Sequence, residues 1–322
     1  MSERVENPDL TVVIVSYNTA HLLDRMFEAI FAARRELKLQ IIVVDNASWD
    51  NSREIIRLKY PDVKLIENEK NAGFGRANNK AVAEALGRYI VLLNTDAFVA
   101  PDTFEKTTKY MDAHPECGVL GVKILGPDGS LRPCGRFFPT PWNVFLINTG
   151  LYRLFPHVQL VDNNLCDQSS VSDCDWVTGC YYMVRRTVID HIGLFDPRFF
   201  LYYEEVDHCR EVRRAGWKVR YYPFTSVEHI GGASAISDQN QSLNSSRQIE
   251  PALIESELLY FRKHFGLYGV ILAVALSAIV YIYNIVKAVL RADRTRLSVM
   301  IRRSLMTFRL LIQTRFASTP TR

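Results

Sequence analysis

The chain has 322 residues, enough for one large hydrophobic core or two smaller ones. Apolar residues make up 48% and charged residues 23%, which is ordinary for a globular protein, and a net charge of +4 is too small to indicate a nucleic-acid-binding protein. From 287 to 322 nine basic residues stand against one acidic residue, so the positive charge belongs to the C-terminal segment. The six cysteines have no C-x-x-C spacing, which favours free thiols in a reducing compartment over a zinc site. The N-terminus lacks the apolar run of a signal peptide, so we expect a cytosolic first domain.

The first third of the chain alternates between strand and helix patterns. Apolar, β-branched runs at 11–17 and 41–46 suit strands that are buried on both faces, and a helical repeat of apolar residues lies between them. Further helices are predicted at 52–59 and 76–86, and further strands at 63–67 and 89–93. This order predicts an α/β domain with a mostly parallel sheet, which binds ligands at the carboxyl ends of its strands.

Polar side chains follow each of these four strands. They are Ser16, Tyr17 and Asn18 after the first strand, Asp45 and Asn46 after the second, Glu67 and Asn68 after the third, and Asn94, Thr95 and Asp96 after the fourth. Any one of them is an ordinary turn residue. Four polar strand ends on one sheet edge predict a common cleft, in which Asp96 is the candidate ligand for Mg²⁺ or Mn²⁺.

The middle of the chain is less regular. A helix up to His114 and a strand at 118–124 precede an irregular region at 130–175, which fits either a lid or a surface excursion. Strands are predicted at 176–184 and 217–222, with helices around 187–191 and up to Arg214.

Three carboxylates, Glu204, Glu205 and Asp207, follow an aromatic run. Like charges so close together raise one another's pKa, which makes a carboxylate usable as a base near neutral pH. Acidic residues also favour the positive end of a helix dipole, so the cluster alone fits a helix start equally well.

Several motifs together resemble a known family. They are VIVSYN (13–18), VVDNAS (43–48), NAGFGRANN (71–79), LLNTDA (92–97), WVTGCYYMVRR (176–186), GLFDPRFFLYYEEVD (193–207), RRAGWKVRYYP (213–223) and VEHIGGAS (227–234). In this order they resemble the inverting family 2 glycosyltransferases of the GT-A fold, and most of all the bacterial rhamnosyltransferase-like branch. The resemblance covers roughly residues 10 to 235.

The resemblance implies a role for each matching residue. The nucleotide-sugar would be held by Ser16, Tyr17, Asn18, Asp45, Asn71, Gly73, Asn78, Asn94 and Thr95, with Asp45 accepting a hydrogen bond from a pyrimidine N3–H. Asp96 and His229 would bind the metal, Mg²⁺ or Mn²⁺, and Glu205 would be the base. Glu204 and Asp207 would orient the acceptor or hold the base. Trp176 and Gly179 would shape the acceptor side, although a core Trp packed on Gly fits nearly as well.

The chain is expected to divide into a GT-A catalytic domain and a membrane-associated end. Residues 1–235 would form the catalytic domain, with a nucleotide-sugar half at about 10–125 and an acceptor half at about 126–235, followed by a connecting segment at 236–262. In the remaining part, 263–322, residues 265–286 carry no charge and are long enough to span a bilayer, and a basic amphipathic pattern follows. A single span would export the arginine-rich tail, so we expect a re-entrant or in-plane segment, with an apolar dimer interface as the alternative.

These expectations describe a metal-dependent enzyme that moves a sugar from a nucleotide diphosphate to a saccharide or polyprenyl-linked saccharide, at the cytoplasmic face of the inner membrane of a bacterium. Rhamnose from dTDP-rhamnose is the first choice of donor, and a UDP-linked galactofuranose or other hexose the second. A sugar-1-phosphate nucleotidyltransferase is disfavoured because SYNTAHLL is not a glycine-rich, basic phosphate loop. A non-catalytic membrane scaffold of the same fold is the remote alternative. No nucleic-acid partner is expected, and a homo-oligomer stays open.

Overall fold

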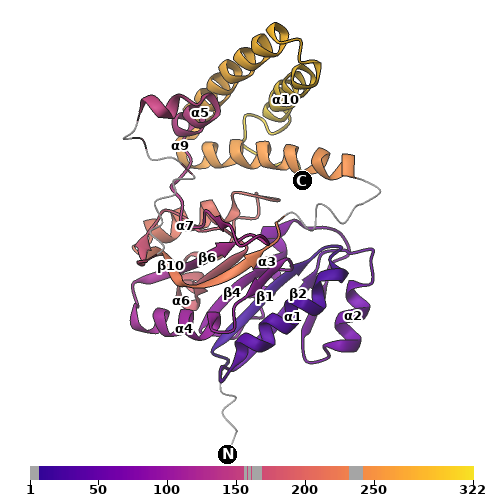
Figure 1. Ribbon diagram of the computed structural model, residues 1–322, viewed down its shortest axis with the longest axis vertical. Coiled ribbons are helices and arrows are strands. Elements are labelled where there is room, and N and C mark those ends of the chain that lie inside the picture. The colour runs from indigo at the N-terminus through magenta and orange to yellow at the C-terminus, as the bar shows by residue number, and fades with distance from the viewer. Residues whose placement is uncertain (1–6, 156–157, 159–160, 162–168, 232–241) are drawn as a thin grey trace, which may run out of the picture.

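The computed structural model describes residues 7–155, 158, 161, 169–231 and 242–322, and the side chains of these residues except those of 242–248. A mixed sheet with the strand order β3-β2-β1-β4-β9-β6-β10-β5 forms the centre of the first domain (Figure 1). Its parallel half consists of β1 (Leu10–Ser16), β2 (Leu39–Asp45), β3 (Lys64–Glu67) and β4 (Tyr89–Asn94). Most β-branched side chains of β1 and β2 are buried because helices cover both faces of the sheet.

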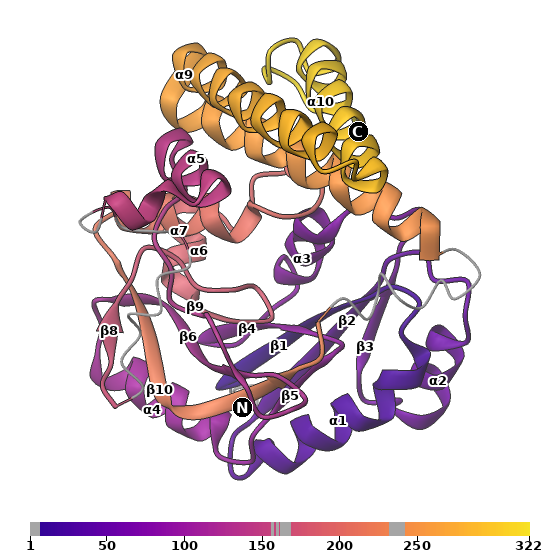
Figure 2. The same cartoon turned by 45° about the horizontal axis from the view of Figure 1, so that its top comes forward.

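Six helices cover the two faces of this sheet. They are α1 (Ala20–Arg34), α2 (Ser52–Lys59), α3 (Phe74–Val82), α4 (Thr103–Ala113), α6 (Arg186–Ile192) and α7 (Glu204–Arg214). Helices α1, α2 and α4 contact one another on one face, and α3 lies on the other, toward the C-terminal helices (Figure 2). The alternating order that the sequence predicts is therefore confirmed.

The second half of the sheet adds antiparallel strands. They are β5 (Ala97–Val99), β6 (Cys117–Leu125), β7 (Leu131–Arg132), β8 (Ser172–Asp173), β9 (Tyr181–Arg185) and β10 (Lys218–His229). β9 runs antiparallel to β4 and β6, while β6 and β10 are parallel to each other. The strand predicted at 176–184 begins only at Tyr181, because Trp176 makes an isolated bridge to Arg136 and leaves the sheet.

The region predicted to be irregular at 130–175 contains a helix, α5 (Pro141–Thr149), and a short 3-10 helix (Leu151–Leu154). Helix α5 begins at a capping box, in which the Thr140 hydroxyl accepts from the Asn143 amide and the Asn143 side chain accepts from the Thr140 amide. The expectation of a region without helix was wrong here.

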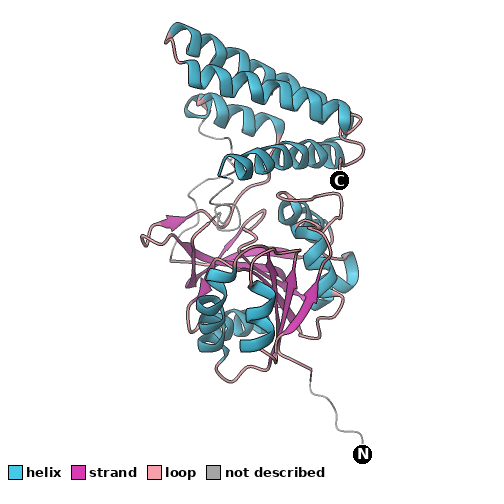
Figure 3. Ribbon diagram, turned by 90° about the vertical axis from the view of Figure 1, so that its right-hand side faces the viewer, coloured by secondary structure: helices cyan, strands magenta, loops and turns pink. Residues whose placement is uncertain are grey.

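Two long helices follow the sheet domain. Helix α9 (Ser242–Leu290) bends at Gly266, whose φ of 67° and ψ of −163° are not helical, and α10 (Arg294–Gln313) returns beside its second half. Figures 1 and 3 show the first half of α9 lying between the sheet domain and this helical pair. The expected domain boundary at 235 lies outside the described residues, and residues 242–262 of the expected connecting segment are helical.

Candidate functional site

A cavity of about 530 Å³ lies at the carboxyl edge of the sheet, beneath α9. Ten of the sixteen predicted site residues line it: Tyr17, Asn71, Gly73, Asn94, Thr95, Asp96, Gly179, Glu204, Glu205 and His229. Asn46, a polar residue at the end of β2, lines it as well. Of the four polar strand ends expected there, three contribute side chains. The end of β3 does not, because Glu67 pairs with Arg57 and Asn68 bonds to Asn46 and Lys80.

Asp96 and His229 form a hydrogen-bonded pair on the cavity wall. β10 pairs with β5 so that His229 stands opposite Ala97, which brings two residues far apart in sequence side by side. The His229 Nε2 lies 3.2 Å from Asp96 Oδ1, and Asp96 Oδ2 accepts a hydrogen bond of 3.0 Å from the Gly231 amide. Burial disfavours the imidazolium, but hydrogen bonds to Asp96 and Cys180 outweigh it and raise the pKa of His229 to about 10.

This pair fits a divalent cation. Asp96 is 6% exposed, and its carboxylate and the imidazole both face the cavity, so an oxygen and a nitrogen donor converge at one place. Carboxylate and imidazole are donors that Mn²⁺ accepts, and Mg²⁺ takes the oxygen donor. A cation that binds both residues would displace the proton that His229 otherwise shares with Asp96.

Glu204 and Glu205 lie at the start of α7, and both line the same cavity. One oxygen of each carboxyl group is buried without a hydrogen-bond partner, so both side chains are prepared to receive a polar group. Burial raises the pKa of Glu205, and burial followed by the charge of Glu205 raises that of Glu204 further. The sequence argument named mutual repulsion as the main cause, and burial is the larger one.

The turn before α7 has an unusual backbone. Tyr202 and Tyr203 have φ values of 70° and 68°, in the left-handed region that aromatic residues rarely occupy. Helix α9 holds this turn: Ser256 Oγ donates to the Leu201 carbonyl oxygen at 2.9 Å, and the Tyr260 ring lies 5.2 Å from that of Tyr203. Such strain persists only where surrounding contacts impose it. The position of the two glutamates therefore depends on the C-terminal helices.

Gly73 connects this turn to the sheet. Its φ is 88°, and a Cβ there would lie 2.4 Å from the Phe200 carbonyl oxygen, so no other residue fits without displacement. The next amide, of Phe74, donates to that same oxygen at 2.8 Å. The loop after β3 and the turn before α7 thus meet at the cavity wall.

Six predicted site residues do not line the cavity, and most of these hold backbone in place. The Ser16 hydroxyl bonds to Thr19, Asn18 Oδ1 accepts from the Trp49 amide, and Asn78 Nδ2 donates to the Phe74 carbonyl. Trp176 is 6% exposed, and its Nε1 donates to the Phe137 carbonyl at 2.8 Å, which matches its alternative interpretation as a core residue.

Asp45 is fully buried behind the wall. Its Oδ1 accepts from Arg53 Nε and from the Ser48 amide, whereas its Oδ2 is buried without a partner. An unpaired buried carboxylate oxygen is costly, and an N–H donor of a ligand would remove that cost. The geometry is compatible with the predicted nucleobase contact, which stays a prediction.

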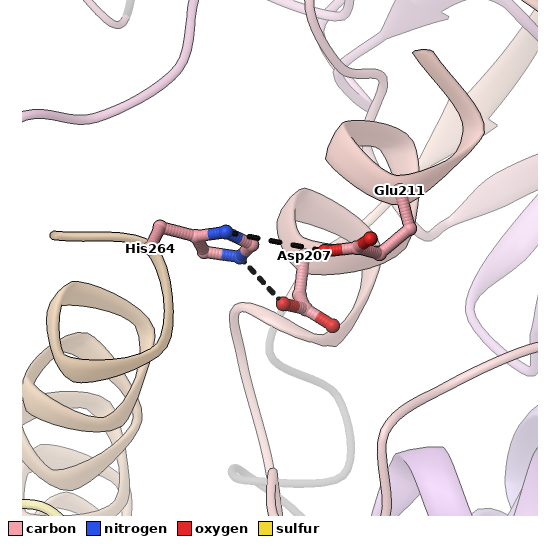
Figure 4. A group of neighbouring side chains, drawn as sticks. All are labelled: Asp207, Glu211 and His264. Atoms are coloured by element: carbon pink, nitrogen blue, oxygen red, sulfur yellow. Dashed lines mark hydrogen bonds and ion pairs between the residues drawn. The ribbon is translucent and has the colours of Figure 1, made fainter. Parts of the chain in front are cut away.

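Asp207 points away from the cavity, toward α9. Its Oδ2 accepts from Lys263 Nζ at 2.7 Å, and its Oδ1 bonds to His264 Nε2 at 2.7 Å. Figure 4 shows Asp207 and Glu211 on one face of α7, with the ring of His264 directed toward them from α9. Their ligand atoms lie within 4.8 Å of one another, yet Lys263 already supplies the positive charge, so the group is best described as an ion-pair contact between α7 and α9.

Sequence reasoning missed several residues of the cavity wall. Arg132 and Arg136 come from the region expected to be irregular, and Ile249, Ala252 and Arg322 from segments assigned to linkage or membrane binding. Their positions follow from tertiary packing, because neither a motif nor a periodicity in the sequence connects them to Asp96 or Glu205. Five cysteines, Cys117, Cys134, Cys174, Cys180 and Cys209, are free and buried, as expected for Cys117 and Cys180.

Comparisons with known proteins agree with this geometry. Residues 11–159 match the family model of Glycosyl transferase family 2. N-acetylglucosaminyl-diphospho-decaprenol L-rhamnosyltransferase of Mycobacterium tuberculosis is 28% identical over 68% of this chain and 75% of its own length. The low-salt glycan biosynthesis hexosyltransferase Agl10 of Haloferax volcanii is 23% identical over 64% of this chain and 62% of its own length.

Two solved structures show the same fold. Staphylococcus aureus TarS, residues 1–349 in complex with UDP, superposes with a TM-score of 0.52 at 14% identity and covers 93% of this chain and 90% of its own. The mannosyltransferase PcManGT of Pyrobaculum calidifontis, in complex with GDP-Man and Mn²⁺, gives a TM-score of 0.51 at 17% identity and covers 98% and 89%. Residues 11–159 are therefore similar to family 2 glycosyltransferases, and the chain has the GT-A fold.

Proposed function

We propose that this glycosyltransferase transfers a rhamnosyl group from dTDP-rhamnose, with inversion, to an N-acetylglucosamine carried on a polyprenyl diphosphate. The observation that carries the proposal is one cavity with Asp96 and His229 on its wall and Glu204 and Glu205 at the start of α7. The mycobacterial relative supports the sugar and the acceptor through its name. A UDP-linked galactofuranose or other hexose is the alternative donor, and a non-catalytic scaffold remains the remote alternative.

The chemistry assigned to the residues is a single displacement. Glu205 takes the proton of the acceptor hydroxyl, the hydroxyl oxygen forms a bond to the anomeric carbon, and the bond from that carbon to the diphosphate oxygen breaks. Burial raises the pKa of Glu205 and so strengthens it as a base. Burial and the charge of Glu205 raise the pKa of Glu204, and this side chain would orient the acceptor through its unpaired oxygen.

Asp96 and His229 are the residues that would hold Mg²⁺ or Mn²⁺, which when bound neutralises charge on the leaving diphosphate. Tyr17, Asn71, Asn94 and Thr95 line the same part of the cavity and would contact the nucleotide-sugar. Asp45 would accept from the pyrimidine N3–H through its unpaired Oδ2.

The C-terminal helices would attach the enzyme to the cytoplasmic face of the inner membrane. One segment within α9, Ile249–Leu290, is apolar and long enough to cross a bilayer, although one such helix is weak support for a span. The second half of α9 exposes Leu267, Tyr268, Ile271, Ile279, Ile282, Tyr283, Val286, Val289 and Leu290. Because α10 returns to the sheet domain and carries five arginines, an amphipathic hairpin in the membrane plane fits better than a single pass. On this proposal residues 1–235 remain the catalytic domain and 263–322 the membrane element.

A transfer assay tests the proposed function. Purified full-length protein in anionic vesicles receives Mn²⁺, a prenyl-diphosphate-linked N-acetylglucosamine, and either dTDP-rhamnose, UDP-galactofuranose or UDP-glucose. Mass spectrometry is expected to show a rhamnosylated product only with dTDP-rhamnose, and NMR an inverted anomeric centre. E205Q is the control without the base. Product with a UDP-sugar and none with dTDP-rhamnose would show that the donor is a UDP-sugar. Equal amounts of product from E205Q and wild type would support the non-catalytic scaffold.

A further inference from the structure

Arg322 contributes to the wall of the cavity although it lies far from the glycosyltransferase motifs in sequence. Its guanidinium carbon lies 4.6 Å from the centroid of the Phe200 ring, in the turn that leads to Glu204. A guanidinium stacked on an aromatic ring is held in orientation while its N–H groups stay available. Among the described residues no carboxylate lies within ion-pair distance of it.

The backbone around Arg322 is fixed from two sides. Thr321 donates through its hydroxyl and its amide to the carboxylate of Glu255, a buried residue of α9. Arg76 of α3 donates from Nη2 to the Arg322 main-chain oxygen at 2.8 Å and from Nε to the Pro197 carbonyl at 2.8 Å. The tail is therefore an ordered part of the wall, and a second guanidinium accompanies the first.

The two other arginines of the cavity serve different neighbours. Arg132 donates to the Ile230 carbonyl oxygen at 3.2 Å, next to the Asp96 and His229 pair. Arg136 lies over Trp176, and its charge lowers the pKa of Glu205 against the larger effect of burial. Arg322 instead contacts Phe200, in the turn that precedes Glu204 and Glu205.

The wall near Arg322 also includes apolar residues of α9. Ile249 and Ala252 line the cavity and precede Glu255 in α9 by six and three residues, and Leu253 on the same helix is exposed. A cationic group next to an apolar helix surface suits a ligand with an anionic head and an apolar tail. A nucleotide-sugar has an anionic diphosphate but no apolar tail, whereas a lipid diphosphate has both groups.

We propose that Arg322, supported by Arg76, binds the diphosphate that joins the acceptor sugar to its lipid. The inference rests on the proposed function for the identity of the acceptor, and it adds the group that recognises the lipid diphosphate. Arg322 is a binding residue for the acceptor, and the donor diphosphate is left to the region of Asp96 and His229.

The test compares an acceptor that has a diphosphate with one that has none. Wild type, R322A, R322Q and R322K are assayed with a short-chain prenyl-diphosphate-linked N-acetylglucosamine and with octyl N-acetylglucosaminide, which has no phosphate. R322A is expected to raise the KM for the diphosphate acceptor roughly tenfold or more, because a hydrogen bond to a charged group is lost. The KM for the donor and for the octyl glycoside should not change, and R322K should lie between R322A and wild type. R315A, a change at an exposed arginine of the same tail, is the matched control.

A calorimetric titration of wild type and R322A with the prenyl diphosphate alone separates this inference from the proposed function. This binding measurement does not depend on sugar transfer. If the wild type is inactive but still binds the prenyl diphosphate more tightly than R322A, only the proposed function is contradicted. Equal affinity of wild type and R322A overturns the inference. Three other results for R322A would overturn the inference. A raised KM for the donor would mean that Arg322 binds the nucleotide-sugar, and an equal loss of activity with both acceptors would mean that its role is structural. Increased activity would mean that the C-terminal tail blocks the cavity. R322Q, which keeps the stacking surface, and thermal unfolding exclude misfolding as the cause.

Discussion

The two parts of the cavity are built in different ways. The part next to Asp96 consists of strand ends, so the register of β1, β2, β4 and β10 fixes its side chains. The part next to Glu205 consists of a strained turn that is held by α9 and bounded by Arg322. On the proposed function, the strand ends would bind the donor and the wall assembled from separate segments would bind the acceptor.

Substitutions of Glu204 and Glu205 should have the largest effect on activity. E205Q is expected to lower kcat by about 10²–10⁴-fold, because the base is lost, with little change in donor KM. E204Q keeps the uncharged state that burial favours at Glu204 and should retain at least ten times the activity of E205Q. Steady-state kinetics with the lipid-linked acceptor measure both. Equal loss in the two variants would contradict the division of roles.

The sheet-edge part should respond to the metal. D96N and H229A are expected to reduce kcat/KM by at least ~100-fold, because charge on the leaving diphosphate is then not neutralised. Both should need much more Mn²⁺ for half-maximal nucleotide binding, measured by calorimetry with the nucleoside diphosphate. H21A, at an exposed histidine of α1, is the control. Unchanged Mn²⁺ dependence would remove these two residues from the metal site.

The junction between the two parts can be broken at Gly73. G73A adds a Cβ that meets the Phe200 backbone and also requires a positive φ, so we expect a loss of about 2–5 kcal/mol of unfolding free energy. G129A has a similar φ of 76° and open space around it, and it should cost only about 1–2 kcal/mol. Urea denaturation measures both. Equal losses would mean that the contact with Phe200 contributes nothing.

The contact between α7 and α9 should affect stability more than chemistry. K263M removes one partner of the buried Asp207 while His264 remains, so unfolding free energy should fall by about 1–3 kcal/mol. K109M breaks an exposed pair with Glu105 and should cost at most about 1 kcal/mol. Thermal unfolding of full-length protein compares them, and a smaller effect of K263M than of K109M would reject the contact as a stabilising one.

The smallest effect concerns acid pH. Burial, opposed by Asp207, lowers the pKa of His264, with Arg210 and Arg214 adding to the lowering. The unfolded chain therefore takes up the proton first, so stability falls as the pH drops below the ordinary histidine value of about 6.5. H264Q, which cannot titrate, should show a flatter dependence between pH 6.5 and the lowered pKa of His264. If the unfolding free energy of wild type and H264Q depends on pH in the same way, another group causes the loss of stability in acid. One such group is His208, whose pKa burial lowers to about 4.

Much of the sheet-edge part could be predicted from the sequence. Buried apolar runs give β1 to β4, and the residues after three of those strands do line the cavity, because strand ends in a parallel sheet meet at one edge. Asp96 and His229 were predicted together only through the family motifs. Their contact depends on an antiparallel pairing of β5 with β10 that local sequence does not reveal.

The other part was harder to predict for physical reasons. Glu205 stands in a recognisable motif, but Asp207 in the same motif faces Lys263 and His264, and its direction is set by a helix far along the chain. Helix α5 was missed although Thr140 and Asn143 form a readable capping box, because the surrounding prolines suggested irregular structure. Arg322 carries no sequence signal for a cavity, since its position follows from Glu255 and Arg76.

The first half of α9 also sets a distance. It lies between the cavity and the helical hairpin, and a helix with its side chains is about 10–12 Å across. With the hairpin on the membrane, a hydroxyl can reach Glu205 only if it stands about one helix diameter from the lipid surface. On the proposed membrane attachment, the width of this helix would limit how far the reacting sugar stands from its lipid.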